Sequence, residues 1–329
     1  MRPFSYRRPR TIDEAIQNYG QAQETRFIGG GTNLLDLMKM GVERPAHLVD
    51  ISRLPLTKIE EHGDGLRIGA LVSNTDAANH PLVRTHYPVL SEAILAGASQ
   101  QLRNMATMGG NLLQRTRCYY FYDPSYAECN KRVPGSGCAA LNGYNRIHAI
   151  LGQSPECIAV HPSDMCVALV ALDAVVQLKG PKGERQIPMT EFHRLPGNTP
   201  QVETNLRSGE LITAIDLPAI PYAKRSRYVK IRDRHSYAFA LVSVAAVMDI
   251  DDSGTVRHAR IALGGVAHKP WRAQKAEIAL VGKKPGDDTL QAAAEAELAD
   301  AHGYKYNTFK IELARRAIVR GVTAAVHAV

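Results

Sequence analysis

The chain has 329 residues, of which 45% are hydrophobic and 22% are charged, and its formal net charge is +8. This length predicts two or three domains, and the composition is that of a globular protein with a core large enough to need no disulfide bonds. The sequence contains no long basic block, no apolar run of about 18 residues and no apolar signal core, which argues against a nucleic-acid binder, a membrane span and a secretory signal of its own. We therefore expect a soluble protein with a mildly basic surface.

The first two thirds of the chain predict a mixture of helices and strands. A capping box, Thr11-Ile-Asp-Glu14, indicates a helix to about Gly20. Apolar periodicity and turn residues predict the elements that follow. They are a buried strand at 27–28, a glycine turn, a helix at 33–40, strands at 46–51 and 66–72, a helix at 88–102, a helix at 163–174 capped by Ser163 or Asp164, a hairpin around Pro181–Gly183 and a strand at 210–218.

Prolines in the stretch around 219–224 indicate a boundary. Three strands are expected after it, at 225–232, 238–250 and 256–266, and the turn DDSGT joins the second to the third. Residues 271–327 are mostly helical in pattern. We therefore expect an α+β protein in which three strands followed by helices form the last part of the chain.

Two glycine motifs are candidates for binding an anion. FIGGGTNL at 27–34 places glycines between a strand and a helix, where backbone N–H groups can approach a phosphate. It is neither a Rossmann fingerprint nor a P-loop. Thr107-Met-Gly-Gly-Asn111 has a similar composition. Each motif alone is as consistent with a tight turn, but together the two favour a diphosphate ligand, because a dinucleotide needs several converging donors.

Two further motifs carry charge. In His161-Pro-Ser-Asp164 the aspartate either caps a helix or accepts hydrogen bonds from a ligand, and His161 is expected to orient the turn. Lys230, Arg232 and Arg234 alternate along an expected strand and so would share one face. That face is either a solvated basic surface or a cationic edge directed at a flavin or a phosphate.

The five cysteines form an odd number, which argues against a disulfide framework. Four of them, at separations of 11, 9 and 19 residues, lie in or at the end of an irregular segment at about 115–158: Cys118, Cys129, Cys138 and Cys157. Four thiolates are what a [4Fe–4S] cluster requires, but the close pairs of zinc sites and ferredoxins are absent. Spacing alone leaves a cluster and unliganded thiols open. Cys166, on an apolar helix, is expected to be a buried free thiol, with replacement of Cys157 as the alternative.

In order, the motifs FIGGGTNL, LRNMATMGGNL, HPSD, KIRDRHSYAFALVSVAA and ALGGVAHKPWRA resemble the FAD-binding subunit of the xanthine dehydrogenase (molybdenum hydroxylase) family over essentially the whole chain. The resemblance is closest to the branch of bacterial three-subunit, periplasmic-type aldehyde oxidoreductases. It implies a two-lobed FAD-binding domain of the vanillyl-alcohol oxidase (PCMH) type at 1–220, with an iron–sulfur insertion at about 115–158. It also implies a smaller C-terminal domain at 221–329, in which a three-stranded sheet packs on helices.

The resemblance implies an electron-transfer subunit with FAD and one [4Fe–4S] cluster. It would pass electrons from the [2Fe–2S] clusters of a small partner subunit to an external acceptor: oxygen, a quinone, ferredoxin or NAD. A large molybdopterin-binding subunit would oxidise the aldehyde, or a xanthine-like substrate as the alternative, so this chain would contain no catalytic residue. The expected location is the cytoplasm, or the periplasm if a signal-bearing partner carries the chain there.

The resemblance also implies the site residues. FAD contacts are expected from both glycine loops, an acidic residue, a hydrophobic residue and a lysine: Arg26, Phe27, Ile28, Gly29, Gly30, Gly31, Thr32, Asn33, Leu34, Thr107, Gly109, Gly110, Asn111, Asp164, Ile212 and Lys230. The cysteine segment resembles the insertion that holds an extra [4Fe–4S] cluster in this branch and in 4-hydroxybenzoyl-CoA reductase. Its implied ligands are Cys118, Cys129, Cys138 and Cys157. The alternatives are a zinc-binding structural subunit without flavin chemistry and, less favoured, a nucleic-acid binder.

Overall fold

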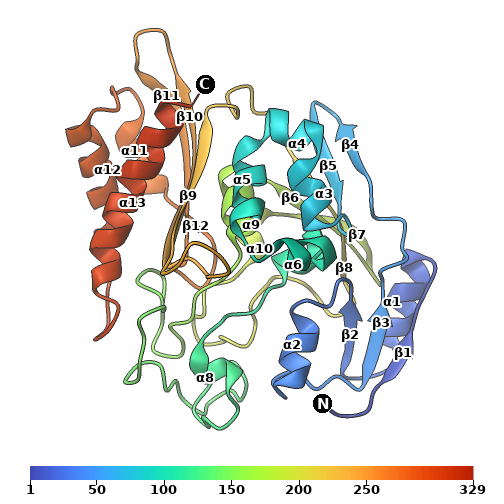
Figure 1. The fold of residues 1–329 in the computed structure, drawn as a ribbon. Coiled ribbons are helices and arrows are strands. Elements are labelled where there is room, and N and C mark those ends of the chain that lie inside the picture. Colours follow the sequence, from blue (N-terminus) through green and yellow to red (C-terminus); the bar gives the residue numbers. More distant parts are fainter. Residues whose placement is uncertain (329) are drawn as a thin grey trace.

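The computed structural model describes residues 1–328, which form three packed units (Figure 1). The first lobe is a parallel sheet in the order β1-β3-β2 with a helix after each of its first two strands. Its elements are β1 (Ser5–Arg7), α1 (Ile12–Gly20), β2 (Thr25–Ile28), α2 (Leu34–Lys39) and β3 (His47–Asp50). Thr11 caps α1 by accepting a hydrogen bond from the Glu14 N–H, which confirms the capping box.

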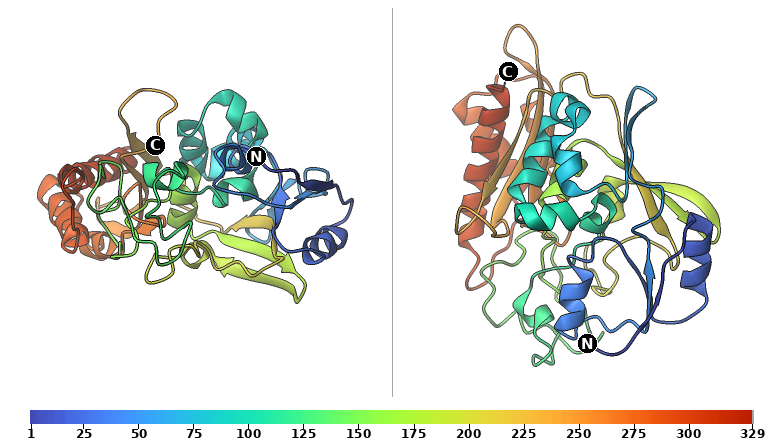
Figure 2. Two further views of the ribbon diagram at one scale, coloured as in Figure 1. Left: turned by 90° about the horizontal axis from the view of Figure 1, so that it is seen from below. Right: turned by 45° about the vertical axis from the view of Figure 1, so that its right-hand side comes forward.

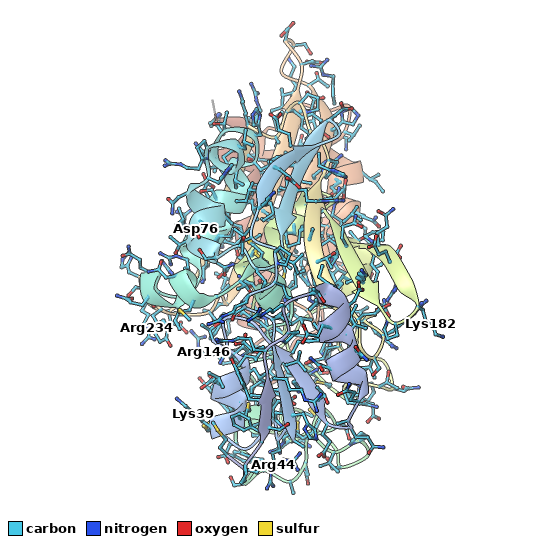
Figure 3. The ribbon with its side chains drawn as sticks, turned by 90° about the vertical axis from the view of Figure 1, so that its right-hand side faces the viewer. Lys39, Arg44, Asp76, Arg146, Lys182 and Arg234 are labelled. Atoms are coloured by element: carbon cyan, nitrogen blue, oxygen red, sulfur yellow. The ribbon has the colours of Figure 1, made fainter. Side chains whose placement is uncertain are left out.

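The second lobe contains an antiparallel sheet in the order β4-β5-β8-β6-β7, with helices against it. Its strands are β4 (Ile59–His62), β5 (Gly65–Gly69), β6 (Val175–Gly180), β7 (Gly183–Pro188) and β8 (Leu211–Leu217). Its helices are α3 (Asn74–Asn79), α4 (Pro81–His86), α5 (Pro88–Ala96), α6 (Gln100–Met105), α7 (Met108–Leu112), α9 (Asp164–Ala171) and α10 (Met189–Phe192). The β6–β7 hairpin turns between Gly180 and Gly183, as predicted, and the labelled Lys182 lies at its tip (Figure 3).

The C-terminal unit is an antiparallel sheet in the order β12-β11-β10-β9, followed by helices. Its elements are β9 (Ser226–Ile231), β10 (Val242–Ile250), β11 (Val256–Gly264), β12 (Trp271–Arg272), α11 (Gln274–Leu280), α12 (Asp287–Leu298) and α13 (Phe309–Val326). The three expected strands are present, but the sheet has four, because the two residues of β12 pair with β11. Two residues after Lys269-Pro270 are too few for a sequence pattern to indicate a strand.

Both faces of the C-terminal sheet are covered, so its central strand is buried on each side. Along β10, Val244, Ala246 and Met248 face α11–α13, whereas Ala245 and Val247 belong to the core of the second lobe. This alternation follows the two-residue period of a strand. Figure 2 shows the C-terminal helices at one end of the molecule and the first lobe at the other, with the second lobe between them.

The helix expected at 88–102 is two helices, so that prediction is wrong in extent. Gly97 closes α5 with an extended backbone, and Ala98 has a φ of +52°, a left-handed conformation that no helix continues through. Ser99 then starts α6 by accepting a hydrogen bond from the Leu102 N–H. The apolar period runs across this break, which is why the sequence pattern did not reveal it.

The segment at 115–158 is irregular, as expected, except for the single turn α8 (Tyr119–Tyr122). Its end docks on the C-terminal unit, where the N–H groups of Ile150 and Leu151 both donate to the Val266 carbonyl. Its middle packs below α2, at the lower end of the view in Figure 1. No helix within residues 1–328 is long and apolar enough to cross a membrane.

Candidate functional site

A cavity of about 1140 Å³ lies where the three units meet. Its lining comes from the first glycine loop, from α5 to α7 and the residues just after them, from the turn before α9, from the loop before β8 and from the loop after β9. A volume above the range usual for small-molecule pockets suits a long ligand. Among the sequence-predicted residues, Arg26 to Leu34, Thr107, Gly110, Asn111, Asp164 and Lys230 line it.

The first glycine loop presents unused donors to this cavity. The N–H groups of residues 30–33 donate no hydrogen bond within the described chain. A Cβ on Gly30 would lie 1.7 Å from the carbonyl oxygen of Met105, and Gly31 has a φ of +72°. Side chains are therefore excluded where the loop passes the end of α6, and free backbone N–H groups at such a place are the feature that binds phosphate.

The second glycine motif is not a loop but the short helix α7, which Thr107 caps through the Gly110 N–H. Gly109 does not line the cavity, in contrast to the expectation. Its N–H donates to the Ala70 carbonyl, and a Cβ there would lie 3.0 Å from the Ala70 Cβ, so glycine is required for packing against β5. The two glycine motifs meet directly, because a Cβ on Gly29 would lie 3.3 Å from the Thr107 Oγ1.

The Asn111 side chain holds two parts of the cavity wall together. Its Nδ2 donates to the Asn74 Oδ1 over 2.7 Å, and its Oδ1 accepts from the Ser163 hydroxyl over 2.7 Å. The same hydroxyl accepts from the Cys166 N–H, so Ser163, rather than Asp164, is the cap of α9. Asn111 thus ties α7 to the HPSD turn.

Asp164 and Lys230 form a buried ion pair between α9 and β9, with Nζ 2.8 Å from Oδ2. Oδ1 of Asp164 accepts from the Tyr228 hydroxyl over 2.6 Å. Burial and the neighbouring carboxylate raise the pKa of Tyr228 well above its usual value, so it stays a donor. Both carboxylate oxygens are engaged, and the pair joins the C-terminal unit to the second lobe beside the cavity.

The expectation that Lys230, Arg232 and Arg234 share a strand face is wrong, because β9 ends at Ile231. Lys230 and Arg232 both donate to the Ala96 carbonyl at the end of α5, and Arg234 bonds to the carbonyl of Tyr237 in the following loop. The strand ends where its partner, β10, begins at Val242. Figure 3 shows the labelled Arg234 and Lys182 on opposite sides of the molecule.

Ile212 does not reach the cavity. It lies in β8, is 4% exposed and belongs to the core of the second lobe. The residues that precede this strand, 206–210, line the cavity instead. Successive side chains of a strand point to opposite faces of the sheet, and Ile212 is on the face that packs into the core of the second lobe.

A network of buried charges at the cavity wall was not anticipated. Glu203 accepts from Arg115 Nε and from Lys131 Nζ, each over 2.6 Å, and the Lys131 Nζ also lies 2.6 Å from the His268 Nε2. Burial raises the pKa of Glu203, but the two cations outweigh it and hold the value at about 2. These residues come from three distant segments of the chain, so no local pattern indicates that they meet.

The four cysteines of the irregular segment converge on one cluster below α2. Cys118, Cys129 and Cys157 are buried in it, and Cys138 packs against it. A two-residue bridge pairs Cys129 with Cys138. All five cysteines, Cys166 included, are free thiols, and Cys166 lies apart in the core of the second lobe.

Burial raises the pKa of Cys118 to about 12 and that of Cys157 to about 11, and in both cases neighbouring cysteines raise it further. The thiols thus face one another in a dry environment that holds them neutral without a cation. The His148 Nε2 lies 3.1 Å from the Cys118 Sγ, and the Ala159 N–H points at the Cys157 Sγ. Donors to sulfur are typical around cysteines that bind iron or zinc.

The spacing of these sulfurs is wider than a single zinc ion takes. A tetrahedral zinc site with Zn–S bonds of 2.3 Å separates its sulfurs by about 3.8 Å. In the described chain, no three of the four cysteines have sulfurs within 4.8 Å of one another. Among the described residues, the potential metal ligands that do lie within 4.8 Å of one another are His161, Cys166 and His193.

Two family models match the chain. One, described as the FAD binding domain in molybdopterin dehydrogenase, matches residues 2–220. The other, the CO dehydrogenase flavoprotein C-terminal domain, matches residues 227–323.

The chain is similar over most of its length to subunits of two oxidoreductases. The aldehyde oxidoreductase FAD-binding subunit PaoB of Escherichia coli (strain K12) is 53% identical over 97% of this chain and 96% of its own length. The carbon monoxide dehydrogenase medium chain of Hydrogenophaga pseudoflava is 29% identical over 90% of this chain and 86% of its own. A solved structure of carbon monoxide dehydrogenase from that organism contains a chain that superimposes with a TM-score of 0.77 at 29% identity, covering 98% of this chain and 97% of that one.

Proposed function

The chain belongs to the FAD-binding subunits of the molybdenum hydroxylase family, and from that premise we propose that it carries electrons within an aldehyde oxidoreductase complex through bound FAD and one [4Fe–4S] cluster. The observation that carries the proposal is the pair of adjoining sites: a large cavity with free backbone donors, and four converging cysteines beside it. The names of the relatives, a FAD-binding subunit and a medium chain, support an enzyme with further subunits. We propose that these are a large molybdopterin-binding subunit and a small [2Fe–2S] subunit.

The residues of the cavity fit FAD in their chemistry. The N–H groups of residues 30–33 would hold the diphosphate, and the absence of a side chain at Gly30 lets the loop lie against the end of α6. The Lys230 ammonium, fixed by Asp164 and the Ala96 carbonyl, would stand beside the flavin ring. Bound FAD would accept and pass on electrons, while the protein fixes its position and surrounds it with a partly apolar wall.

The cysteine cluster fits a [4Fe–4S] cluster better than the alternative, a zinc ion. Four thiols from one irregular segment converge, and in the described chain no three of their sulfurs lie within 4.8 Å of one another, whereas a tetrahedral zinc site brings all four to about 3.8 Å. A cube of four irons and four sulfides is larger than one ion and takes four cysteine ligands. A bound cluster would also neutralise thiolates that burial otherwise disfavours.

The two sites are joined by direct contacts. The Asn33 Oδ1, in the first glycine loop, accepts from the Arg115 N–H over 3.0 Å, at the start of the cysteine segment. In α2, which follows the loop, Leu37 packs in the same core as Cys118 and Cys157. Lys131, two residues after Cys129, reaches Glu203 at the cavity wall. This rigid connection is what two redox centres in one chain need to stay at a fixed separation.

Cys118→Ser tests the proposal in the purified complex. We expect the cluster iron to be lost and most of the FAD to remain, because the glycine loops lie outside the cysteine segment. Iron, zinc and flavin are measured per chain, together with the absorption and electron paramagnetic resonance spectra of the reduced protein.

Cys166→Ala is the matched control, and it should keep the cluster iron because Cys166 lies in a different core. It also tests Cys166 as a replacement for Cys157. Zinc in place of iron in the unmodified complex would support the alternative of a structural zinc subunit. A folded complex that lacks FAD, or that loses flavin and iron together in Cys118→Ser, would contradict the proposed separation of the sites.

A further inference from the structure

We propose that His161, Cys166 and His193 form a second metal site, specific for a thiophilic divalent cation such as Zn²⁺, in the wall of the cavity. One ligand atom from each of the three residues lies within 4.8 Å of the others. His161 belongs to the turn before α9, Cys166 to the first turn of α9, and His193 directly follows α10. The site is distinct from the four-cysteine cluster, since Cys166 belongs to the core of the second lobe.

Two buried nitrogen atoms in this group have no hydrogen-bond partner and are free to bind a cation. The His161 Nε2 and the His193 Nδ1 are both buried and form no hydrogen bond. The two rings lie with their centroids 4.2 Å apart, so the two atoms belong to one small space. A buried nitrogen left without a partner destabilises the folded protein, and a shared cation would give both rings a partner.

The hydrogen bonding of His193 leaves its free nitrogen ready to bind a metal. Its Nε2 lies 2.8 Å from the Leu112 carbonyl oxygen, which can only accept, so the proton of the neutral ring is on Nε2. Its Nδ1 therefore carries the lone pair. A histidine that donates from one nitrogen to a backbone carbonyl and binds a metal through the other is the usual arrangement at metal sites. Burial lowers the pKa of His193 to about 4, so the ring is neutral at neutral pH.

Cys166 supplies the sulfur that selects the metal. Its backbone N–H donates to the Ser163 hydroxyl over 3.2 Å, which holds the residue in the first turn of α9. Burial raises the pKa of its thiol to about 12, so a cation would bind as the thiol loses its proton. Two imidazoles and one thiolate favour Zn²⁺ over Mg²⁺ or Ca²⁺, which prefer oxygen.

The site would have a fourth position open to the cavity. His161 and His193 line the cavity, whereas Cys166 lies behind them. Three protein ligands and one open position are the arrangement of zinc sites that bind a further ligand. The ion would also pin the HPSD turn, and with it Asp164, to the end of α10. This inference does not depend on the cluster, and it uses none of the cluster cysteines.

The test is zinc binding by the purified complex, equilibrated with Zn²⁺ alone, freed of unbound metal, and analysed for zinc, iron and flavin in the same samples. We expect one tightly bound zinc per chain in addition to the cluster iron. Cys166→Ala and His193→Gln should both lose that zinc and keep iron and flavin. His80→Gln is the control, because the His80 Nδ1 is likewise buried without a partner but His80 does not belong to this group of three potential ligands.

X-ray absorption at the zinc edge of the unmodified complex identifies the ligands of the bound zinc, and it tests the site even if a variant fails to fold. A shell of one sulfur and two imidazole nitrogens supports the site. No bound zinc, a shell without sulfur, or a shell of four sulfurs from zinc in the cysteine cluster would overturn it. Loss of iron or flavin from the unmodified complex would instead count against the proposed function.

Discussion

At the scale of single residues, the cavity depends on positions where no side chain fits. Gly30 meets the end of α6 so closely that even a methyl group would overlap the Met105 carbonyl. The sequence identified this glycine as part of a run of three. It did not indicate which of the three must be glycine because a side chain would overlap a neighbour, and which because its backbone has a positive φ. The structure shows that Gly30 is required by its contact with α6, and that Gly31 is favoured by its positive φ.

Gly30→Ala should therefore weaken FAD binding by roughly tenfold or more, because the loop must move away from α6 by an amount that costs about 1–3 kcal/mol. Flavin content after gel filtration and the dissociation constant for added FAD measure the effect. Gly20→Ala, at the end of α1 where a Cβ would meet nothing within 4 Å, is the control and should keep its flavin. Equal flavin content in the two variants would contradict this role.

The low pKa of Glu203 predicts how the stability of the folded protein depends on pH in the acid range. The folded protein holds the pKa of Glu203 at about 2, against 4.5 for an unperturbed glutamate, because Lys131 and Arg115 outweigh the effect of burial. Between these values the unfolded chain binds a proton that the folded chain does not. The contribution of Glu203 to stability, at most about 3 kcal/mol, is therefore complete above pH 4.5 and is lost as the pH falls towards 2.

Urea unfolding followed by circular dichroism at pH 6, 4.5 and 3 measures this contribution. The difference in unfolding free energy between the unmodified chain and Glu203→Gln should shrink as the pH falls through this window. A difference that stays constant would show that Glu203 titrates normally. The comparison between the two proteins cancels the other carboxylates that also titrate in acid.

At the scale of elements, the break between α5 and α6 shapes the cavity. Gly97 and Ala98 both line it, and the Ala96 carbonyl at the end of α5 accepts from Lys230 and Arg232. A continuous helix would leave no free carbonyl there, because that group would bond within the helix. The break therefore positions the lysine that is proposed to stand beside the flavin.

Ala98→Gly tests the strain at the break. Alanine at a φ of +52° is disfavoured by about 1 kcal/mol, so glycine should raise the melting temperature by roughly 1–3 °C without loss of flavin. Ala93→Gly, inside α5, should instead lower it by at least as much, because glycine is a poor helix former and a buried methyl group is lost. Differential scanning fluorimetry compares the two. A lower melting temperature for both variants would argue against strain at Ala98.

At the scale of the whole molecule, the units share their cores. Ala245, Val247 and Ala262 of the C-terminal sheet belong to the core of the second lobe, and Ile150 and Leu151 of the irregular segment belong to the core under α11–α13. The Asp164–Lys230 ion pair crosses the same boundary. Neither unit buries its apolar surface alone.

We therefore predict that the full chain unfolds in one thermal transition by calorimetry, with coincident loss of helix and of flavin fluorescence quenching. Gly264→Ala should lower this transition without splitting it, since its Cβ would lie 2.6 Å from a methyl group of Val167 at the contact between β11 and α9. Two resolved transitions in the unmodified chain would show that the units are energetically independent.

Local patterns in the sequence determined the hairpin, the cap of α1, the α+β class, the motifs that identify the family and the strands other than β1, β4 and β12, because each depends on residues close together in the chain. The structure decided which residues meet. In the structure, Gly109 and Ile212 lie outside the cavity lining, the expected helix at 88–102 is two helices, and Lys131 forms an ion pair with Glu203. The structure also joined His161 and Cys166 to His193, a contact set by the packing of α9 beside α10. Burial, free lone pairs and sulfur spacing arise only when distant segments pack, and no period or motif encodes them.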